Sequence, residues 1–174
     1  LLGGRLARTG SPALQAIWNQ LPGKRTPVEW ALRWLWNQPE VSVVLSGMSA
    51  MEQVEENVLI AGEASVDSLS EAELAVIRRA KEYYLAQTKV ECTGCQYCAG
   101  CPAKIKIADI FHLYNSAYMY DEHSRTRQAY QRMIAREQDF SHCLDCGQCE
   151  DVCPQHLEVR SHLRHFHKEF SKNK

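Results

Sequence analysis

Apolar residues recur at helical spacing in most of the chain, and short runs of turn residues separate the segments that carry them. Three of these segments follow a residue that caps helices well, namely Ser11, Thr26 and Ser49. A glutamate three residues after Thr26 and after Ser49 completes a capping box. In the first 66 residues the pattern therefore predicts helices over residues 12–21, 27–37 and 50–61.

One segment of this region has a different pattern. Val41 to Leu45 is a mostly apolar, β-branched run bounded by Pro39 and Gly47. A strand that is buried on both faces, as in a parallel sheet, has this pattern. The pattern therefore predicts an α/β fold for residues 1–66.

Two further segments follow. Residues 67–90 are predicted to form a linker helix, which begins with a capping box from Ser70 to Glu73. In residues 91–174 the apolar positions keep helical spacing and no strand pattern is present, so an α-helical domain is expected there. The predicted helices of this domain cover residues 108–118, 124–136 and 157–170.

Charge and hydropathy exclude two classes of partner. The chain has 20 Lys and Arg against 21 Asp and Glu, so it has no global basic field that would attract nucleic acid. No run approaches the roughly 18 consecutive apolar residues of a membrane-spanning helix. We therefore expect neither nucleic acid nor a membrane as a partner.

The cysteines are confined to one part of the chain. All eight lie between Cys92 and Cys153. The sequence begins at Leu1, and no charged segment leads into an apolar one, so no secretory signal is visible. Clustered cysteines in a protein without a secretory signal bind metal more often than they form disulfides. We therefore expect metal binding and a cytoplasmic location.

The second cysteine run fits the spacing C-x2-C-x2-C-x3-C-P of bacterial ferredoxins without a mismatch. It consists of Cys143, Cys146, Cys149 and Cys153, and Pro154 follows. Three thiolates at steps of three residues wrap one corner of a cubic cluster, and the amides between them form a concavity for the sulfides. The fourth iron then needs a more distant cysteine.

The first run resembles the second, with one departure. Two residues separate Cys98 from Cys101, where the bacterial run has three, and Pro102 follows. In two-cluster modules the fourth cysteine of each run ligates the other cluster. One [4Fe–4S] cluster is predicted to take Cys92, Cys95, Cys98 and Cys153. The other is predicted to take Cys143, Cys146, Cys149 and Cys101.

Structural zinc is the alternative to iron–sulfur clusters. Paired C-x2-C knuckles can hold two tetrahedral zinc ions. A zinc ribbon uses two cysteines per knuckle, however, and gives no role to the third cysteine at the same step. Disulfides are disfavoured because cysteines three residues apart on tight loops cannot all pair with good geometry.

Four stretches of the N-terminal region resemble the aldo/keto reductase family. Residues 41–49 (VSVVLSGMS) and 52–57 (EQVEEN) resemble the last barrel strand and the following helix of that family. Residues 2–7 (LGGRLA) resemble the loop after its seventh strand, and residues 30–34 (WALRW) the helix before its eighth. With the cysteine-rich segment, the chain resembles the C-terminal part of aldo/keto reductases fused to a two-cluster ferredoxin domain.

The resemblance implies a (β/α)8 barrel that binds NADP or NAD at the C-terminal ends of its strands. Loop residues near the N-terminus would lie beside the pyrophosphate. Residues 46–49 would lie beside the adenosine phosphate, and three residues of the next helix would face the adenine ribose. The implied contacts are Leu2, Gly3, Gly4, Ser46, Gly47, Met48, Ser49, Gln53, Glu56 and Asn57.

The catalytic residues of that family come from earlier strands, which are not in this chain. A barrel needs about 250 residues, so this chain alone is not expected to reduce a carbonyl, and the remainder of the barrel becomes an expected partner. The other expected partner is a redox protein or a nicotinamide nucleotide.

The expected fold is thus α/β plus all-α: part of a (β/α)8 TIM barrel over residues 1–66, a linker helix over 67–90, and an α-helical dicluster ferredoxin domain over 91–174. The expected function is an iron–sulfur oxidoreductase of aldo/keto reductase type. A non-enzymatic electron carrier and a zinc-stabilised interaction module are the two alternatives.

Overall fold

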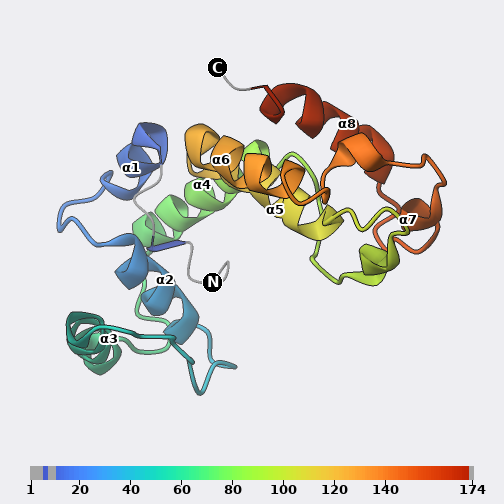
Figure 1. Cartoon of the computed structure of the whole chain (residues 1–174). Helices are drawn as coiled ribbons and strands as arrows, with labels where there is room; N and C mark the ends of the chain where they lie inside the picture. Colours follow the sequence, from blue (N-terminus) through green and yellow to red (C-terminus); the bar gives the residue numbers. More distant parts are fainter. Residues whose placement is uncertain (1–5, 8–10, 173–174) are drawn as a thin grey trace. The chain divides into compact units, whose positions relative to one another are not determined.

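The computed structural model describes residues 6–7 and 11–172, and within these ranges the chain forms helices joined by loops (Figure 1). The chain divides into two compact units, Leu1–Leu85 and Ala86–Lys174. The first unit contains α1 (Pro12–Trp18), α2 (Pro27–Trp36), α3 (Met51–Glu63) and α4 (Glu71–Gln87), the last of which ends just past the division. The second contains η2 (Tyr97–Gly100), α5 (Ile107–Met119), α6 (His123–Ile134), η3 (Phe140–His142), α7 (Gln148–Asp151) and α8 (Val159–Phe170).

Three of the predicted helix starts are confirmed by their capping bonds. The Leu14 amide donates to Ser11 Oγ over 3.2 Å, and the Glu29 amide donates to Thr26 Oγ1 over 3.1 Å. Ser70 and Glu73 form the reciprocal bonds of a capping box at the start of α4.

The predicted cap of one helix, Ser49, differs from the structure. At α3 the cap residue is Ala50, which makes no side-chain bond. The predicted cap Ser49 instead donates its backbone amide to Gln53 Oε1 over 2.9 Å.

The predicted strand at 41–45 and the predicted part of a (β/α)8 barrel are wrong. None of the described residues is in a strand, and residues 41–49 have no regular secondary structure. A strand needs a neighbour to pair its backbone N–H and C=O groups, and the described part of the first unit supplies only helices. The apolar run therefore stays in a loop that exposes 74% of Val43 and 94% of Leu45.

The first unit is held together by aromatic packing and by contacts to α4. The buried rings of Trp18 and Trp30 stack with centroids 6.0 Å apart. Ser11 and Tyr83 share a hydrogen bond, and Arg25 forms an ion pair with Glu73. The helix predicted as a linker therefore packs within the first unit.

We expect the first unit to self-associate through the apolar side chains that it exposes. Besides Val43 and Leu45, the exposed large apolar residues include Met51, Val58 and Leu59 of α3. Contiguous exposed apolar surface favours association. Light scattering should therefore show particles larger than one chain, and Leu45→Lys should shift them toward the monomer. Gln20→Lys, which adds the same charge at another exposed position, is the control. A monodisperse monomer of the unaltered protein would contradict this prediction.

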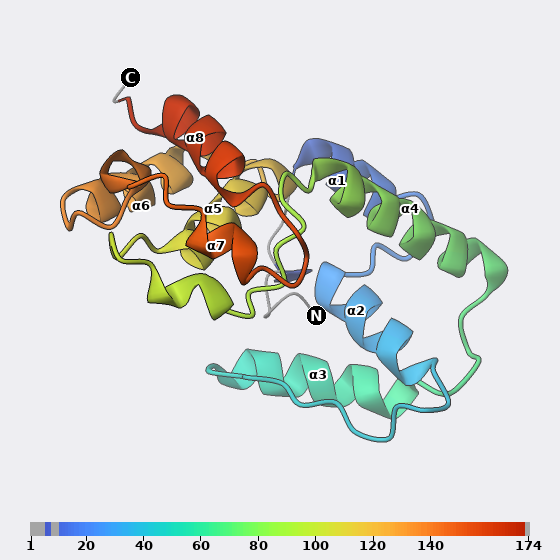
Figure 2. The same ribbon diagram turned by 90° about the vertical axis from the view of Figure 1, so that its right-hand side faces the viewer.

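The second unit packs α5, α6 and α8 around an aromatic core (Figure 2). Phe166 lies at its centre, with ring centroids 4.7 Å from both Tyr130 and Phe170. Phe111 of α5 and Leu163 of α8 are buried in the same cluster. None of the described helices is both long and apolar enough to cross a membrane.

Candidate metal centre

The two cysteine runs share one backbone conformation around their second cysteine. The residue before the second cysteine of each run is left-handed, with φ of 71° at Gly94 and 53° at Asp145. The residue after that cysteine is left-handed as well, with φ of 64° at Gln96 and 80° at Gly147. Such left-handed residues turn successive amides toward one concave side, which is how iron–sulfur sites bind anionic groups. Both runs are therefore shaped as anion-binding loops.

The unequal spacing of the runs is explained by the turn that contains the third cysteine. In the first run this turn is the 3₁₀ helix η2, where the Ala99 amide donates to the Gln96 carbonyl over 2.9 Å. In the second run it is the short α-helix α7, where the Asp151 amide donates to the Gly147 carbonyl over 3.2 Å. A 3₁₀ turn takes fewer residues than an α turn, so the first run reaches its fourth cysteine with one residue less.

The repeat continues past the fourth cysteine of each run. Three residues after Cys101 and Cys153 stand left-handed residues, Lys104 and His156, whose amides donate to the carbonyls of those cysteines over 2.9 and 3.0 Å. Helices α5 and α8 then begin at corresponding positions. Because both helices bury their apolar faces in one core, the fold brings the two runs together.

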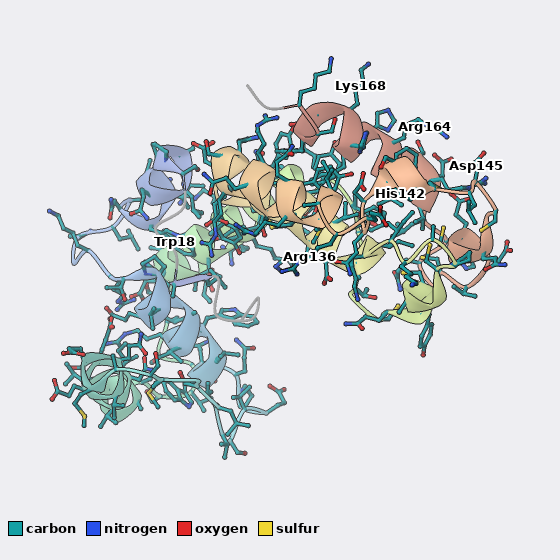
Figure 3. All side chains as sticks on the ribbon, viewed as in Figure 1. Trp18, Arg136, His142, Asp145, Arg164 and Lys168 are labelled. Carbon is teal, nitrogen blue, oxygen red and sulfur yellow. The ribbon has the colours of Figure 1, made fainter. Side chains whose placement is uncertain are left out.

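Two cavities combine cysteines of both runs, and they lie where the sulfur atoms drawn in yellow in Figure 3 gather beside η2 and α7. The smaller, of about 20 Å³, is lined by Cys92, Cys95, Cys98, Cys153 and Cys149. The larger, of about 130 Å³, is lined by Cys101, Cys143, Cys146, Cys149 and Cys98. Each of these two cavities therefore combines the first three cysteines of one run with the fourth cysteine of the other. A third cavity is lined by Cys98 and Cys101 of the first run alone.

The pKa values of two thiols reflect the same grouping. Burial raises the pKa of Cys98, and the neighbouring thiols of Cys92, Cys95 and Cys153 raise it further. Burial, with Glu150, Cys143 and Cys101 as smaller causes, raises the pKa of Cys149 to about 11. The crossed cysteines therefore lie within electrostatic reach of the opposite run.

The residues present fit two [4Fe–4S] cubanes. All eight cysteines are free thiols, and the Gly94 amide already donates to Cys92 Sγ over 3.4 Å. Amide bonds to sulfur are one means by which proteins tune such clusters. Among the described residues, no three His, Cys, Asp or Glu side chains converge on a single-ion site. The smaller cavity must widen to hold a cubane, and its wall includes the exposed residues Cys95 and Tyr97.

One amide side chain fixes the chain just before the first run. Asn115 of α5 accepts hydrogen bonds at Oδ1 from the amides of Lys89 and Val90, over 2.9 and 3.0 Å. Its Nδ2 donates to the Val90 carbonyl over 2.7 Å. These bonds attach the segment that leads to Cys92 to the helical core.

We expect Asn115→Ala to destabilise the second unit by about 1–3 kcal/mol, because it leaves partly buried backbone groups without partners. Asn115→Asp keeps the acceptor oxygen and should lose less. Chemical denaturation followed by circular dichroism measures both changes. Equal losses of stability in the two variants would contradict a role for the hydrogen bonds from the amides of Lys89 and Val90.

The predicted nucleotide contacts lie in the first unit, apart from Leu2, Gly3 and Gly4, which are outside the described residues. Asn57 Nδ2 donates to Ser46 Oγ over 3.2 Å. Ser49 is exposed, and its backbone amide donates a hydrogen bond to Gln53 Oε1. An open groove of about 300 Å³ is lined by Ser46, Gly47, Met48, Gln53, Glu56 and Asn57 together with apolar residues of α2. Nucleotide binding by this groove stays a prediction.

A basic residue that no cysteine motif indicates lies at the larger cavity. Arg160 of α8 lines that cavity and bonds both Asp145 and Glu150. A comparison of the two runs position by position could have singled it out. At the corresponding positions the first run and its helix carry Gly94, Ala99 and Ala108.

Comparison with known proteins identifies the part of the second unit that carries the cysteines. A protein-family model described as a 4Fe-4S dicluster domain matches residues 91–157. No curated protein and no solved structure matches the chain. These comparisons give no support to an aldo/keto reductase. Residues 91–157 are a 4Fe-4S dicluster domain of ferredoxin type.

Proposed function

We propose that this protein transfers electrons through two [4Fe–4S] clusters held by its eight cysteines. The observation that carries the proposal is the crossed grouping at the two cavities, where three cysteines of one run meet the fourth of the other. The proposed ligands of the first cluster are Cys92, Cys95, Cys98 and Cys153. Those of the second are Cys143, Cys146, Cys149 and Cys101.

The chain itself supplies the ligands, the amide donors and a shared wall between the two sites. When bound, [4Fe–4S] clusters supply one-electron transfer at potentials that the surroundings set within roughly −700 to +450 mV. Cys98 and Cys149 line both cavities, so only thin protein walls separate the two sites. This closeness supports transfer from one site to the other within the domain.

The electron donor and acceptor are proposed to be a redox protein or a nicotinamide nucleotide. Exposed Tyr97, Leu144 and Val152 line the larger cavity, and Cys146 there is exposed too. An exposed ligand beside apolar side chains offers a partner a short approach to the site. Electron carriage of this kind needs no catalytic residue from a reductase barrel.

Metal and sulfide analysis after anaerobic purification tests the proposal. Two [4Fe–4S] clusters require about eight iron and eight acid-labile sulfide per chain, with a brown colour that dithionite bleaches. Colourless protein with about two zinc ions and no sulfide would replace the proposal with the zinc-stabilised module.

A second experiment addresses electron transfer itself. Dithionite-reduced protein, freed of excess reductant, should reduce an oxidised acceptor such as cytochrome c under anaerobic conditions. The Cys95→Ala/Cys146→Ala double variant, which removes one ligand from each proposed cluster, is the control. Equal rates with the unaltered protein and the control would show that the clusters do not carry the electrons.

A further inference from the structure

Arg160 forms a clamp on the second cysteine run. Its Nε and Nη2 donate to Glu150 Oε2 over 3.0 and 2.6 Å. Its Nη1 donates to Asp145 Oδ1 over 3.2 Å and to the Asp145 carbonyl over 3.1 Å. The backbone amide of Arg160 completes the set by donating to Glu150 Oε1 over 2.9 Å. One residue of α8 thus bonds two acidic residues of the run.

The two acidic residues enclose a pair of proposed cluster ligands. Asp145 directly precedes Cys146, and Glu150 directly follows Cys149. Arg160 therefore fixes both ends of the four-residue segment that carries these thiols.

Arg160 lies at the larger cavity as well as beside the second cysteine run. Arg160 lines the larger cavity together with Cys143, Cys146 and Cys149. A Cβ built on Gly147 would lie 3.9 Å from Arg160 Nη2, which places the positive charge next to the turn between these cysteines. Asp145, one of the two acidic residues that Arg160 bonds, is labelled in Figure 3 close to α7.

The first run has no counterpart of this clamp. Its corresponding positions are Gly94, Ala99 and Ala108, whose side chains carry no charge and no hydrogen-bonding group. The two runs share the left-handed residues that flank their second cysteine and differ in the turn that contains the third, and the clamp adds a difference in side chains. The two sites therefore differ in charge and in attachment to the helical core.

We propose that Arg160 is a positioning residue that secures the second cluster and raises its reduction potential. This inference rests on the proposed function, because it presupposes that both clusters bind. Outer-shell groups that hold metal ligands contribute strongly to metal retention. Reduction adds a negative charge to the site, which a fixed guanidinium stabilises. Without Arg160, the carboxylates of Asp145 and Glu150 would remain beside the site without their cation.

Iron release to a strong chelator tests the securing role. In Arg160→Gln, one cluster should be lost about 10–100-fold faster than in the unaltered protein, while the other is lost at its original rate. Arg164→Gln is the matched control, because Arg164 lies on the same helix with its Nη2 3.9 Å from Asp145 Oδ1. Equal acceleration of both clusters, or no acceleration, would overturn the proposal.

Redox titration followed by electron paramagnetic resonance tests the electrostatic role. Arg160→Gln should lower the midpoint potential of one cluster and leave the other unchanged. Arg160→Lys keeps the charge and should return the potential toward that of the unaltered protein, although a lysine cannot make the forked bonds. Equal shifts in Arg160→Gln and Arg164→Gln would show that net charge alone acts, and would overturn the positioning role.

The responding cluster is identified by the Cys146→Ala variant, since the signal that this variant loses belongs to the second cluster. If Arg160→Gln takes up no cluster at all, Arg160→Lys carries the test through the same two measurements.

The outcomes also separate this inference from the proposed function. Unaltered protein without iron would refute the function, whereas full iron content with an unresponsive Arg160→Gln would refute only the clamp.

Discussion

Removal of iron from the anaerobically purified protein is expected to unfold residues 86–174 as one unit. The cavities lie where the two runs meet, so bound clusters tie together segments that are far apart in sequence. Structural zinc sites bind with about 10–16 kcal/mol, which is comparable to the whole stability of a typical domain, about 5–15 kcal/mol. Loss of two multi-ligand centres can therefore abolish the cooperative fold of this unit.

Far-UV circular dichroism before and after chelation measures this loss. The tryptophans provide an internal control, because Trp18, Trp30, Trp34 and Trp36 all lie in the first unit. Their emission maximum should stay constant while the helical signal of the second unit falls. Unchanged helicity and an unchanged melting temperature would show that the aromatic core around Phe166 holds the unit without the clusters.

Replacement of either crossed cysteine is expected to damage the cluster of the opposite run. Cys153→Ser should alter the same spectroscopic signal as Cys95→Ser, because both residues line the smaller cavity. Cys101→Ser should alter the same signal as Cys146→Ser, because both line the larger one. Each single variant should lose up to about half of the iron, since the two clusters have separate ligand sets.

Electron paramagnetic resonance of the reduced variants distinguishes the two signals, and anomalous scattering from iron in crystals locates both clusters. A Cys153→Ser variant that shares its altered signal with Cys146→Ser would show that each run ligates its own cluster. In that case the crossed assignment would fail even though two clusters bind.

Local signals in the sequence predicted the helices well. Thr26 and Ser70 satisfy amides at the first turn of their helices, and such bonds depend on neighbours in sequence alone. The strand prediction for residues 41–45 is wrong because these residues form a strand only where other strands pair with them. Whether such strands are present is a property of the surroundings, which the composition of one segment does not contain.

The cysteine site was predictable only as far as it depends on neighbours in sequence. Spacing identified the two runs, and Cys101 and Cys153 each line a cavity with the first three cysteines of the other run. The crossed ligation itself stays a prediction. The 3₁₀ turn that contains Cys98 could not be predicted from spacing, because a run that is one residue shorter does not specify which of its turns is tighter. The clamp of Arg160 joins residues of separate elements, so only their three-dimensional arrangement reveals it.

The crossed grouping has a consequence for how the protein is made. On the ribosome, Cys92, Cys95 and Cys98 emerge well before Cys153. Synthesis runs at about 5–20 residues per second, so several seconds pass between them. With crossed ligation neither cluster has a complete ligand set until the second run has left the exit tunnel. Cluster insertion would then follow synthesis of nearly the whole domain, and a chain that stopped short of Cys153 would leave the first site with only three thiols.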